Sequence, residues 1–220
     1  MVLSPCLWLV KQIVKSLTYL KTTIMKMLPN LDKYTVILAS NSPRRHELLT
    51  GLGIDYSIKV LPDIEETYPS SMPAAEIPCH LSRQKAAAYS SEMRKDELII
   101  TADTIVSCQG TVLGKPTDIV EAKEMLHFLS GKKHEVITGV SLTTTTFQQT
   151  FSATTTVYFD ALSDEVIDYY VNNFRPFDKA GAYGIQEWIG YMGIKRIEGS
   201  YFNVMGLPVQ QLFQVLKEID

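Results

Sequence analysis

The stretch that most constrains the fold of this chain is a short apolar run followed at once by a turn rich in serine and arginine. The run covers residues 36–39, and the turn reads Ser-Asn-Ser-Pro-Arg-Arg over residues 40–45. A short, β-branched apolar run is typical of a buried strand. Ser42 is a good N-cap, and Pro43 fits the first position of a helix, where its missing N–H costs nothing. The sequence therefore predicts a strand, a tight turn and a helix.

The two arginines of this turn suggest an anion. Arg44 and Arg45 fall in the first turn of the predicted helix, where the backbone dipole is already positive. A strand that leads into the positive N-terminus of a helix is a phosphate-binding arrangement. A surface helix with two solvated arginines would explain the same residues equally well. The choice between these two interpretations therefore depends on the rest of the chain.

Length and charge exclude some classes of protein. A chain of 220 residues can bury a full core as one domain. Its net charge is −3, and subtracting the four lysines of residues 1–30, a stretch without acidic residues, leaves about −7 for residues 31–220. Such an acidic body is a poor partner for nucleic acid. Any polyanion must therefore bind in a local basic pocket.

Residues 1–30 are predicted to be an N-terminal extension of a main domain over residues 31–220. Lysines interrupt the apolar residues of this extension, so it is too short to span a membrane, and a signal peptide would carry its charge earlier. Met25 or Met27 is our hypothesis for the true start. The three cysteines are widely spaced and form no C-x-x-C pair, which fits a reducing, cytoplasmic location.

The main domain alternates predicted strands and helices, which indicates an α/β fold with a mixed sheet. The strands are expected at residues 56–60 and 98–107, and in a long hairpin over 134–146 and 151–160 with its tip at 147–149. The later helices are expected at residues 75–93, 118–130, 163–175 and 208–219.

Three acidic residues need an explanation. Asp103 interrupts an apolar strand, which is costly unless the carboxylate is paired or functional. Glu65 and Glu66 lie in a loop rich in proline and serine that follows a predicted strand. Such residues are well placed to hold a metal ion, although solvated loop charges would look the same.

Six motifs, in order, closely resemble the Maf family. The resemblance runs from about Leu31 to the C-terminus and rests on Ser-Asn-Ser-Pro-Arg-Arg (40–45), Ala-Asp-Thr (102–104), Leu-Gly-Lys-Pro (113–116), Leu-Ser-Gly (129–131), Thr-Gly-Val (138–140) and Asp-Lys-Ala-Gly-Ala-Tyr-Gly-Ile-Gln (178–186). Each motif alone is weak, but six in order are a strong signal.

The resemblance implies an elongated α/β fold with a mixed sheet and a central cleft, similar to inosine triphosphate pyrophosphatase. It implies a nucleoside triphosphate pyrophosphatase that cleaves between the α- and β-phosphates with a divalent cation, Mg²⁺ or Mn²⁺. The last motif resembles the branch of the family that acts on dTTP and UTP, whereas the branch that acts on 7-methyl-GTP carries a different segment there.

The resemblance also assigns roles to individual residues. Asp103 is the expected general base, and Glu66 is the leading metal ligand, with Glu65 open because the register is uncertain by one residue. The residues expected to bind the triphosphate are Ser40, Ser42, Arg44, Arg45, Lys85 and Lys115. The residues expected to set substrate specificity are Arg44, Thr104 and Gln186, whose amide offers both a donor and an acceptor to a pyrimidine.

Two other functions stay open at this point. The chain can be a regulator of septum formation that acts through a protein partner, or it can perform the same chemistry on another nucleotide. The expected partner is the nucleoside triphosphate itself, with no nucleic acid and no membrane. Oligomeric state is not readable from the sequence, so a homodimer is left open.

Overall fold

The computed structural model describes residues 27–219, so the predicted start site at Met25 and most of the predicted extension lie outside the described residues. The packed part of the chain includes residues that the sequence assigns to that extension. Leu28 is 2% exposed and belongs to the main core, and the side chain of Asn30 donates to the carbonyl oxygens of Leu216 and Ile219.

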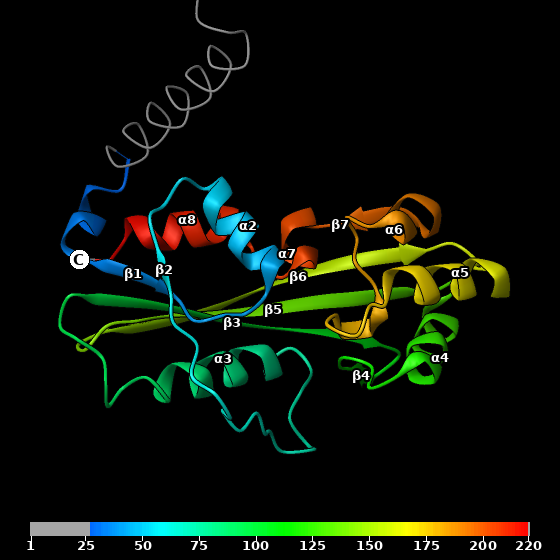
Figure 1. Ribbon diagram of the computed structural model, residues 1–220, viewed down its shortest axis with the longest axis horizontal. Coiled ribbons are helices and arrows are strands. Elements are labelled where there is room, and N and C mark those ends of the chain that lie inside the picture. The colour runs from blue at the N-terminus through cyan, green and yellow to red at the C-terminus, as the bar shows by residue number, and fades with distance from the viewer. Residues whose placement is uncertain (1–26, 220) are drawn as a thin grey trace, which may run out of the picture.

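Strands and helices alternate along the chain, as predicted (Figure 1). The strands are β1 (Thr35–Leu38), β2 (Ser57–Ile58), β3 (Glu97–Cys108), β4 (Thr111–Leu113), β5 (Lys133–Thr143), β6 (Gln148–Phe159) and β7 (Ile194–Glu198). The α-helices are α2 (Pro43–Gly51), α3 (Ile77–Ala87), α4 (Ile119–Leu129), α5 (Asp164–Phe174), α6 (Trp188–Gly193), α7 (Tyr201–Met205) and α8 (Val209–Lys217). Short 3₁₀ helices form η1 (Pro29–Lys33) and η2 (Ala180–Ala182).

All the strands belong to one mixed sheet, which confirms the predicted fold class. Their order is β2-β1-β3-β5-β6-β7, and β4 pairs with β3 off this path. The strand β1 is parallel to β2 and β3, whereas the remaining pairs are antiparallel. The long strands β3, β5 and β6 run along the longest axis and give the molecule its elongated shape (Figure 1).

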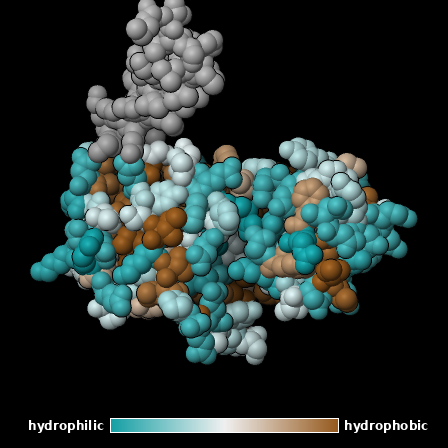
Figure 2. All heavy atoms as spheres, viewed as in Figure 1, coloured by the Kyte–Doolittle hydropathy of each residue, from teal (hydrophilic) through white to brown (hydrophobic). Residues whose placement is uncertain are grey.

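Helices cover both faces of this sheet. The helix α3 packs on β3 and β5, and α7 packs on β5 and β6 from the opposite face, beside α2 and α8 (Figure 1). On the face shown in Figure 2, a band of hydrophilic side chains separates two groups of apolar residues. Among the described residues, none of the helices has the length and hydropathy that a bilayer crossing needs.

The outer edge of β3 is paired at both ends but open in the middle. The strand β1 pairs with residues 97–100, and β4 pairs with residues 106–108. Within the described chain, residues 101–105 have no strand partner on this edge, while the other edge is paired continuously with β5. Asp103 and Thr104 lie in this opening. Since successive side chains of a strand point to opposite faces, Asp103 is directed toward α3 and Thr104 toward α2 and α7.

Several element boundaries differ from the predictions. The helix α3 ends at Ala87 rather than near residue 93, because the chain turns there and buries Tyr89, whose hydroxyl donates to the Lys59 carbonyl oxygen and accepts from the Leu61 N–H. The strand β4 was not predicted. The hairpin tip lies at residues 144–147, where the Thr144 hydroxyl accepts from the Phe147 N–H, so residues 148 and 149 already belong to β6.

Gly139 lets α3 approach the sheet directly beside Asp103. Gly139 is the β5 residue that pairs with Asp103 across the β3–β5 ladder. A Cβ atom added at Gly139 would lie 2.3 Å from the carbonyl carbon of Pro78 and 2.4 Å from the nitrogen of Cys79, at the start of α3. The absence of a side chain here therefore sets the distance at which α3 holds Lys85 over Asp103.

We predict that Gly139→Ala lowers the free energy of unfolding by about 1–3 kcal/mol, because the added methyl group meets backbone atoms that no rotamer change can move away. Chemical denaturation measures this loss. The control is Gly51→Ala, at the end of α2, where an added Cβ meets no atom within 4 Å and no loss is expected. A Gly139→Ala protein as stable as the wild type would contradict this packing.

Candidate active site

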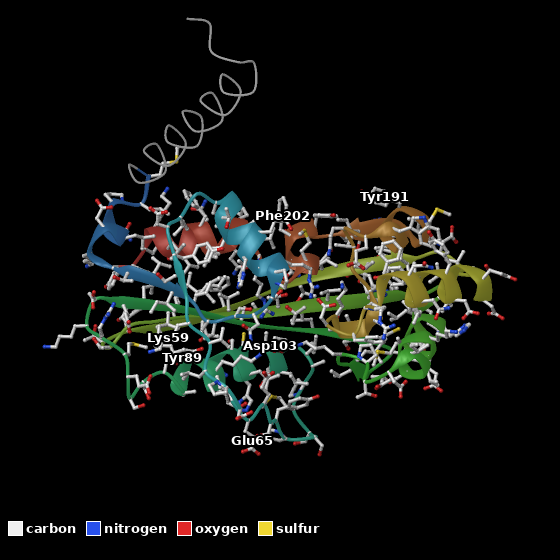
Figure 3. The ribbon with its side chains drawn as sticks, in the orientation of Figure 1. Lys59, Glu65, Tyr89, Asp103, Tyr191 and Phe202 are labelled. Carbon is white, nitrogen blue, oxygen red and sulfur yellow. The ribbon has the colours of Figure 1, made fainter. Side chains whose placement is uncertain are left out.

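A cleft occupies the opening in the edge of β3 and collects all the residues predicted for the site. It consists of two adjoining hollows. Asp103, Thr104 and Gln186 line the first hollow, Ser40 and Glu66 line the second, and both are lined by Ser42, Arg44, Arg45, Lys85 and Lys115. Figure 3 shows Asp103 near the middle of the molecule, above Glu65 at the tip of the acidic loop. The structure therefore brings together residues that are up to 146 positions apart in the sequence.

The serine–arginine turn has the predicted backbone but a different hydrogen-bond pattern. Ser42 occupies the N-cap position of α2 and Pro43 follows it, yet the Ser42 side chain makes no capping hydrogen bond. Instead, the buried Ser40 hydroxyl accepts from the Ser42 N–H at 3.2 Å and from Arg45 Nη1 at 3.4 Å. Ser40 thus organises the turn, and Ser42 is the serine whose hydroxyl is free to meet a ligand.

Arg45 is held by the protein rather than left free for phosphate. Its Nε donates to the Gly206 carbonyl oxygen at 2.8 Å, and its Nη1 donates to the Ala102 carbonyl oxygen at 2.8 Å, on the open edge of β3. Its Nη2 donates to Thr104 Oγ1 at 3.1 Å. Burial lowers the pKa of Arg45, and Arg44 adds to this shift, whereas Asp103 and Glu66 oppose it. With the bond to Ser40, one of the five guanidinium N–H groups is left for a ligand.

Thr104 has a hydroxyl whose direction is fixed by its neighbours. Thr138 Oγ1 lies 2.9 Å from Thr104 Oγ1 and donates to the Asn203 carbonyl oxygen at 3.1 Å. Since a hydroxyl has one proton, Thr104 must be the donor to Thr138, and it accepts from Arg45. Thr104 therefore presents only a remaining lone pair and its methyl group to the cleft.

Lys85 contacts both Asp103, the predicted general base, and Glu66, the predicted metal ligand. Its Nζ lies 2.6 Å from Asp103 Oδ1 and 2.9 Å from Glu66 Oε2, and the lysine side chain is 15% exposed. Asp103 is 9% exposed, so this ion pair supplies the partner that a buried carboxylate requires. Of the two loop glutamates considered as metal ligands, Glu66 lines the cleft and Glu65 does not.

Two carboxylates with an intervening lysine are a donor set that a divalent cation can use. Within residues 27–219, no group of three histidine, cysteine, aspartate or glutamate residues is arranged to hold a metal ion. Mg²⁺, however, retains several waters and binds through one or two carboxylates together with substrate phosphates. The Glu66 and Asp103 carboxylates therefore fit a cation that arrives with a triphosphate.

Arg44 reaches across the cleft to the segment that precedes η2. Its Nη1 lies 2.6 Å from Asp178 Oδ2, and its Nη2 donates to the Asp178 carbonyl oxygen at 3.3 Å. Burial raises the pKa of Asp178, but hydrogen bonds from Lys179 and Arg44 outweigh burial, so the pKa lies below its ordinary value. Asp178 is thus an ionised partner for both cations at the mouth of the cleft.

Lys115 is the cleft cation that is free to bind an anion without breaking a contact. It follows β4, it is exposed, and it has no hydrogen bond or ion pair to the described part of the chain. Arg44, Lys85 and Lys179 all contact carboxylates of the protein. Five cationic side chains and two carboxylates line the first hollow, which gives it the local positive charge that the acidic body lacks.

The first hollow also has apolar lining residues. Val106, Val136 and Val204 line it together with Gln186, whose Oε1 is buried without a hydrogen-bond partner in the described residues. Tyr183 lines it too, and its hydroxyl lies 2.7 Å from Nε2 of His134, whose pKa burial lowers to about 4. Tyr183 is 5% exposed and belongs to the main core.

Sequence reasoning missed four residues that support the cleft. Asp178 and Lys179 stand at the start of the last motif and were read only as part of its pattern. Glu187 follows that motif directly, and Tyr170 lies within the helix predicted over residues 163–175. Asp178, Lys179 and Glu187 could have been found in the sequence, because these charged residues flank a segment of small residues, Ala180–Ala182.

The chain is similar to known proteins over most of its length. A family model described as Maf-like protein matches residues 35–219. A dTTP/UTP pyrophosphatase of Phocaeicola vulgatus is 62% identical over 193 residues, which cover 88% of this chain and 100% of the relative. The protein of the same name from Bacteroides thetaiotaomicron is 59% identical over 193 residues with the same coverage, and that of Porphyromonas gingivalis W83 is 53% identical over 194 residues, covering 87% and 98%.

A solved structure of a HAM1 protein from Coxiella burnetii aligns with a TM-score of 0.43 at 16% identity, covering 84% of this chain and 100% of that chain. This likeness is too distant to support an inference.

We predict that Arg45→Lys lowers the free energy of unfolding by about 2–3 kcal/mol, because a lysine cannot replace a guanidinium that bridges α2, β3 and the end of α7. Urea unfolding measures the loss. Arg44→Lys is the matched control, since its partner Asp178 has a side chain that is 54% exposed and such a pair contributes less than about 1 kcal/mol. An equal loss of unfolding free energy in the two variants would show that Arg45 does not hold α2, β3 and the end of α7 together.

Proposed function

The chain belongs to the Maf family, and on that premise we propose that it is a nucleoside triphosphate pyrophosphatase that hydrolyses dTTP and UTP to the monophosphate and pyrophosphate. Relatives of that name span nearly the whole described chain. The observation that carries the proposal is the contact of Lys85 with Asp103 and Glu66 in a cleft lined by further cations. The reaction would clear the nucleotide pool of unwanted pyrimidine triphosphates, modified ones included.

The phosphates would bind at the end of the cleft where α2 begins. The triphosphate carries about four negative charges, and the N-terminus of α2, the Ser42 hydroxyl, Arg44 and Lys115 supply donors to it. Lys115 needs no rearrangement, whereas Arg44 exchanges part of its contact with Asp178 for phosphate. Arg45 acts mainly by holding the turn in place.

Asp103 would act as the general base. Lys85 donates to Oδ1 and holds the carboxylate in place, and the second carboxylate oxygen, which has no protein partner among the described residues, is left to accept a water proton. The water oxygen then forms a bond to phosphorus in line with the leaving oxygen, and the bond between the α- and β-phosphates breaks. Water and triphosphate thus give monophosphate and pyrophosphate, with the proton passing to Asp103.

We further propose that a divalent cation, Mg²⁺ or Mn²⁺, binds at Glu66 together with the triphosphate. When bound, it neutralises the charge that develops on the leaving pyrophosphate. Lys85 keeps the two carboxylates from repelling each other before the nucleotide arrives. Cys79 and Cys108 are free thiols, which suits the cytoplasmic location that we propose.

The nucleobase would occupy the first hollow beside Gln186. Gln186 offers an unpartnered amide oxygen there, and Thr104 and the three lining valines would limit the size of the base. A single carboxamide matches the donor and acceptor edge of uracil or thymine.

A panel of nucleoside triphosphates tests the proposed function. Pyrophosphate release with Mg²⁺ is expected to be faster for dTTP and UTP than for CTP, ATP and GTP by at least about tenfold. EDTA should abolish turnover, and added Mg²⁺ or Mn²⁺ should restore it. A chain that releases no pyrophosphate from any triphosphate is not this enzyme, and a non-catalytic role through a protein partner then becomes the better explanation.

We predict that Asp103→Asn lowers kcat by roughly 10²–10⁴, the usual range for the loss of a general base, because the amide cannot take a proton. Steady-state pyrophosphate release from UTP measures the effect. Asp168→Asn is the matched control, since Asp168 also lies 2.6 Å from a lysine, Lys123, but outside the cleft. Turnover of Asp103→Asn close to that of the control would make Asp103 a structural residue.

A further inference from the structure

The residue that would read the base, Gln186, sits within a closed turn. The Glu187 N–H donates to the Gly184 carbonyl oxygen at 3.0 Å and closes residues 184–187 into a single turn. A Cβ atom added at Gly184 would lie 2.9 Å from the Glu187 carboxyl carbon and 3.1 Å from Gln186 Nε2, so the turn is tightly packed. Gln186 Oε1 is buried on this turn with no partner in the described residues.

One hydroxyl group from α5 binds both ends of this turn. Tyr170 is fully buried, and its hydroxyl accepts a hydrogen bond from the Gly184 N–H at 3.1 Å and donates one to Glu187 Oε2. Burial and the bond to Glu187 raise the pKa of Tyr170 far above its ordinary value, so the phenol keeps its proton. The direction of both hydrogen bonds is therefore fixed.

The same chain of contacts continues to the phosphate end of the cleft. Lys179 Nζ lies 3.0 Å from Glu187 Oε1 and 2.7 Å from Asp178 Oδ1, and Asp178 Oδ2 binds Arg44. Two cations alternate with two carboxylates, so the chain is neutral and every charged group in it is paired. Tyr170 forms the inner end of this chain and does not itself line the cleft.

We propose that Tyr170 is a positioning residue for base selectivity, whose hydroxyl holds the turn 184–187 and thereby fixes the orientation of the Gln186 carboxamide. The proposal rests on the proposed function. It assigns a role in substrate choice to a side chain on α5 that touches neither the base nor the phosphates.

The hydrogen-bonding edges of the pyrimidines explain why the orientation of the Gln186 carboxamide decides the selectivity between UTP and CTP. Uracil and thymine present an N3–H donor beside an O4 acceptor, whereas cytosine presents an N3 acceptor beside an N4 amino donor. A carboxamide held with its oxygen toward position 3 accepts from uracil N3–H and donates to O4. The same carboxamide rotated by half a turn matches cytosine instead. Selectivity for UTP over CTP therefore requires that the amide cannot rotate.

Tyr170→Phe tests the proposal. It removes both hydrogen bonds of the hydroxyl and is expected to lower the ratio of kcat/KM for UTP to that for CTP by about tenfold, the equivalent of one hydrogen bond, mostly through KM. Gln186→Ala removes the carboxamide that would contact the base. Its change in the ratio is therefore the upper limit for Tyr170→Phe. Tyr158→Phe is the matched control, because the Tyr158 hydroxyl also donates to a glutamate, Glu198, in an exposed hydrogen bond between β6 and β7, and no change in the ratio is expected.

An equal loss of kcat/KM for UTP and CTP in Tyr170→Phe would overturn the proposal, because a purely structural tyrosine acts on both substrates alike. Should Tyr170→Phe fail to fold, Glu187→Gln loosens the other end of the turn and is expected to shift the ratio in the same direction. Calorimetric dissociation constants for UTP and CTP give the same ratio without catalysis. A wild-type protein that binds UTP more tightly than CTP but hydrolyses neither would refute the proposed function and leave this test intact.

Discussion

The candidate site depends on an interrupted strand pairing. The strand β3 exchanges one outer neighbour, β1, for another, β4, and residues 101–105 are left between them. An unpaired backbone edge inside a protein must find other donors, and Arg45 supplies one to the Ala102 carbonyl oxygen. The opening also makes both faces of the sheet accessible from one cleft. Asp103, directed to one face, and Thr104, directed to the other, can therefore serve the same ligand.

Three cations of the cleft, Arg44, Lys85 and Lys179, are already paired with carboxylates of the protein. Lys85 lies between Glu66 and Asp103, and Arg44 and Lys179 share Asp178. Unpaired buried cations would cost several kcal/mol each, so the carboxylates reduce the penalty of keeping a phosphate site preformed. A bound triphosphate would then compete with carboxylates for the same donors, which favours a ligand that carries more charge than they do.

The sequence predicts the local features of this site well, because they depend on neighbours in the chain. The strand, turn and helix at residues 35–51 follow from an apolar run, an N-cap position and a proline, and Asp103 stood out because a lone carboxylate within an apolar strand demands a partner. The alternation of elements also gave the mixed sheet. The family resemblance added the roles of the residues, and the structure places all of these residues in one cleft.

Long-range pairings could not be predicted in the same way. The contact of Arg44 with Asp178 joins residues 134 positions apart, and nothing in the local pattern of either one indicates the other. Arg45 donates to the carbonyl oxygens of Ala102 and Gly206, 57 and 161 positions away, and its local sequence does not indicate either contact. Tyr170 has the spacing of an ordinary core residue, and only the fold shows that its hydroxyl binds the turn that carries Gln186.

The central claim is that one cleft binds both the phosphates and the base. Amide hydrogen exchange with and without a non-hydrolysable analogue, α,β-methylene-UTP, tests it most directly. Binding should slow exchange in two separate segments, the turn at residues 40–45 and the turn at residues 184–187, and leave the edge strand β7 unchanged. Slowed exchange confined to other parts of the chain, such as the apolar hollow formed by Leu31, Val36 and Ile54, would contradict it.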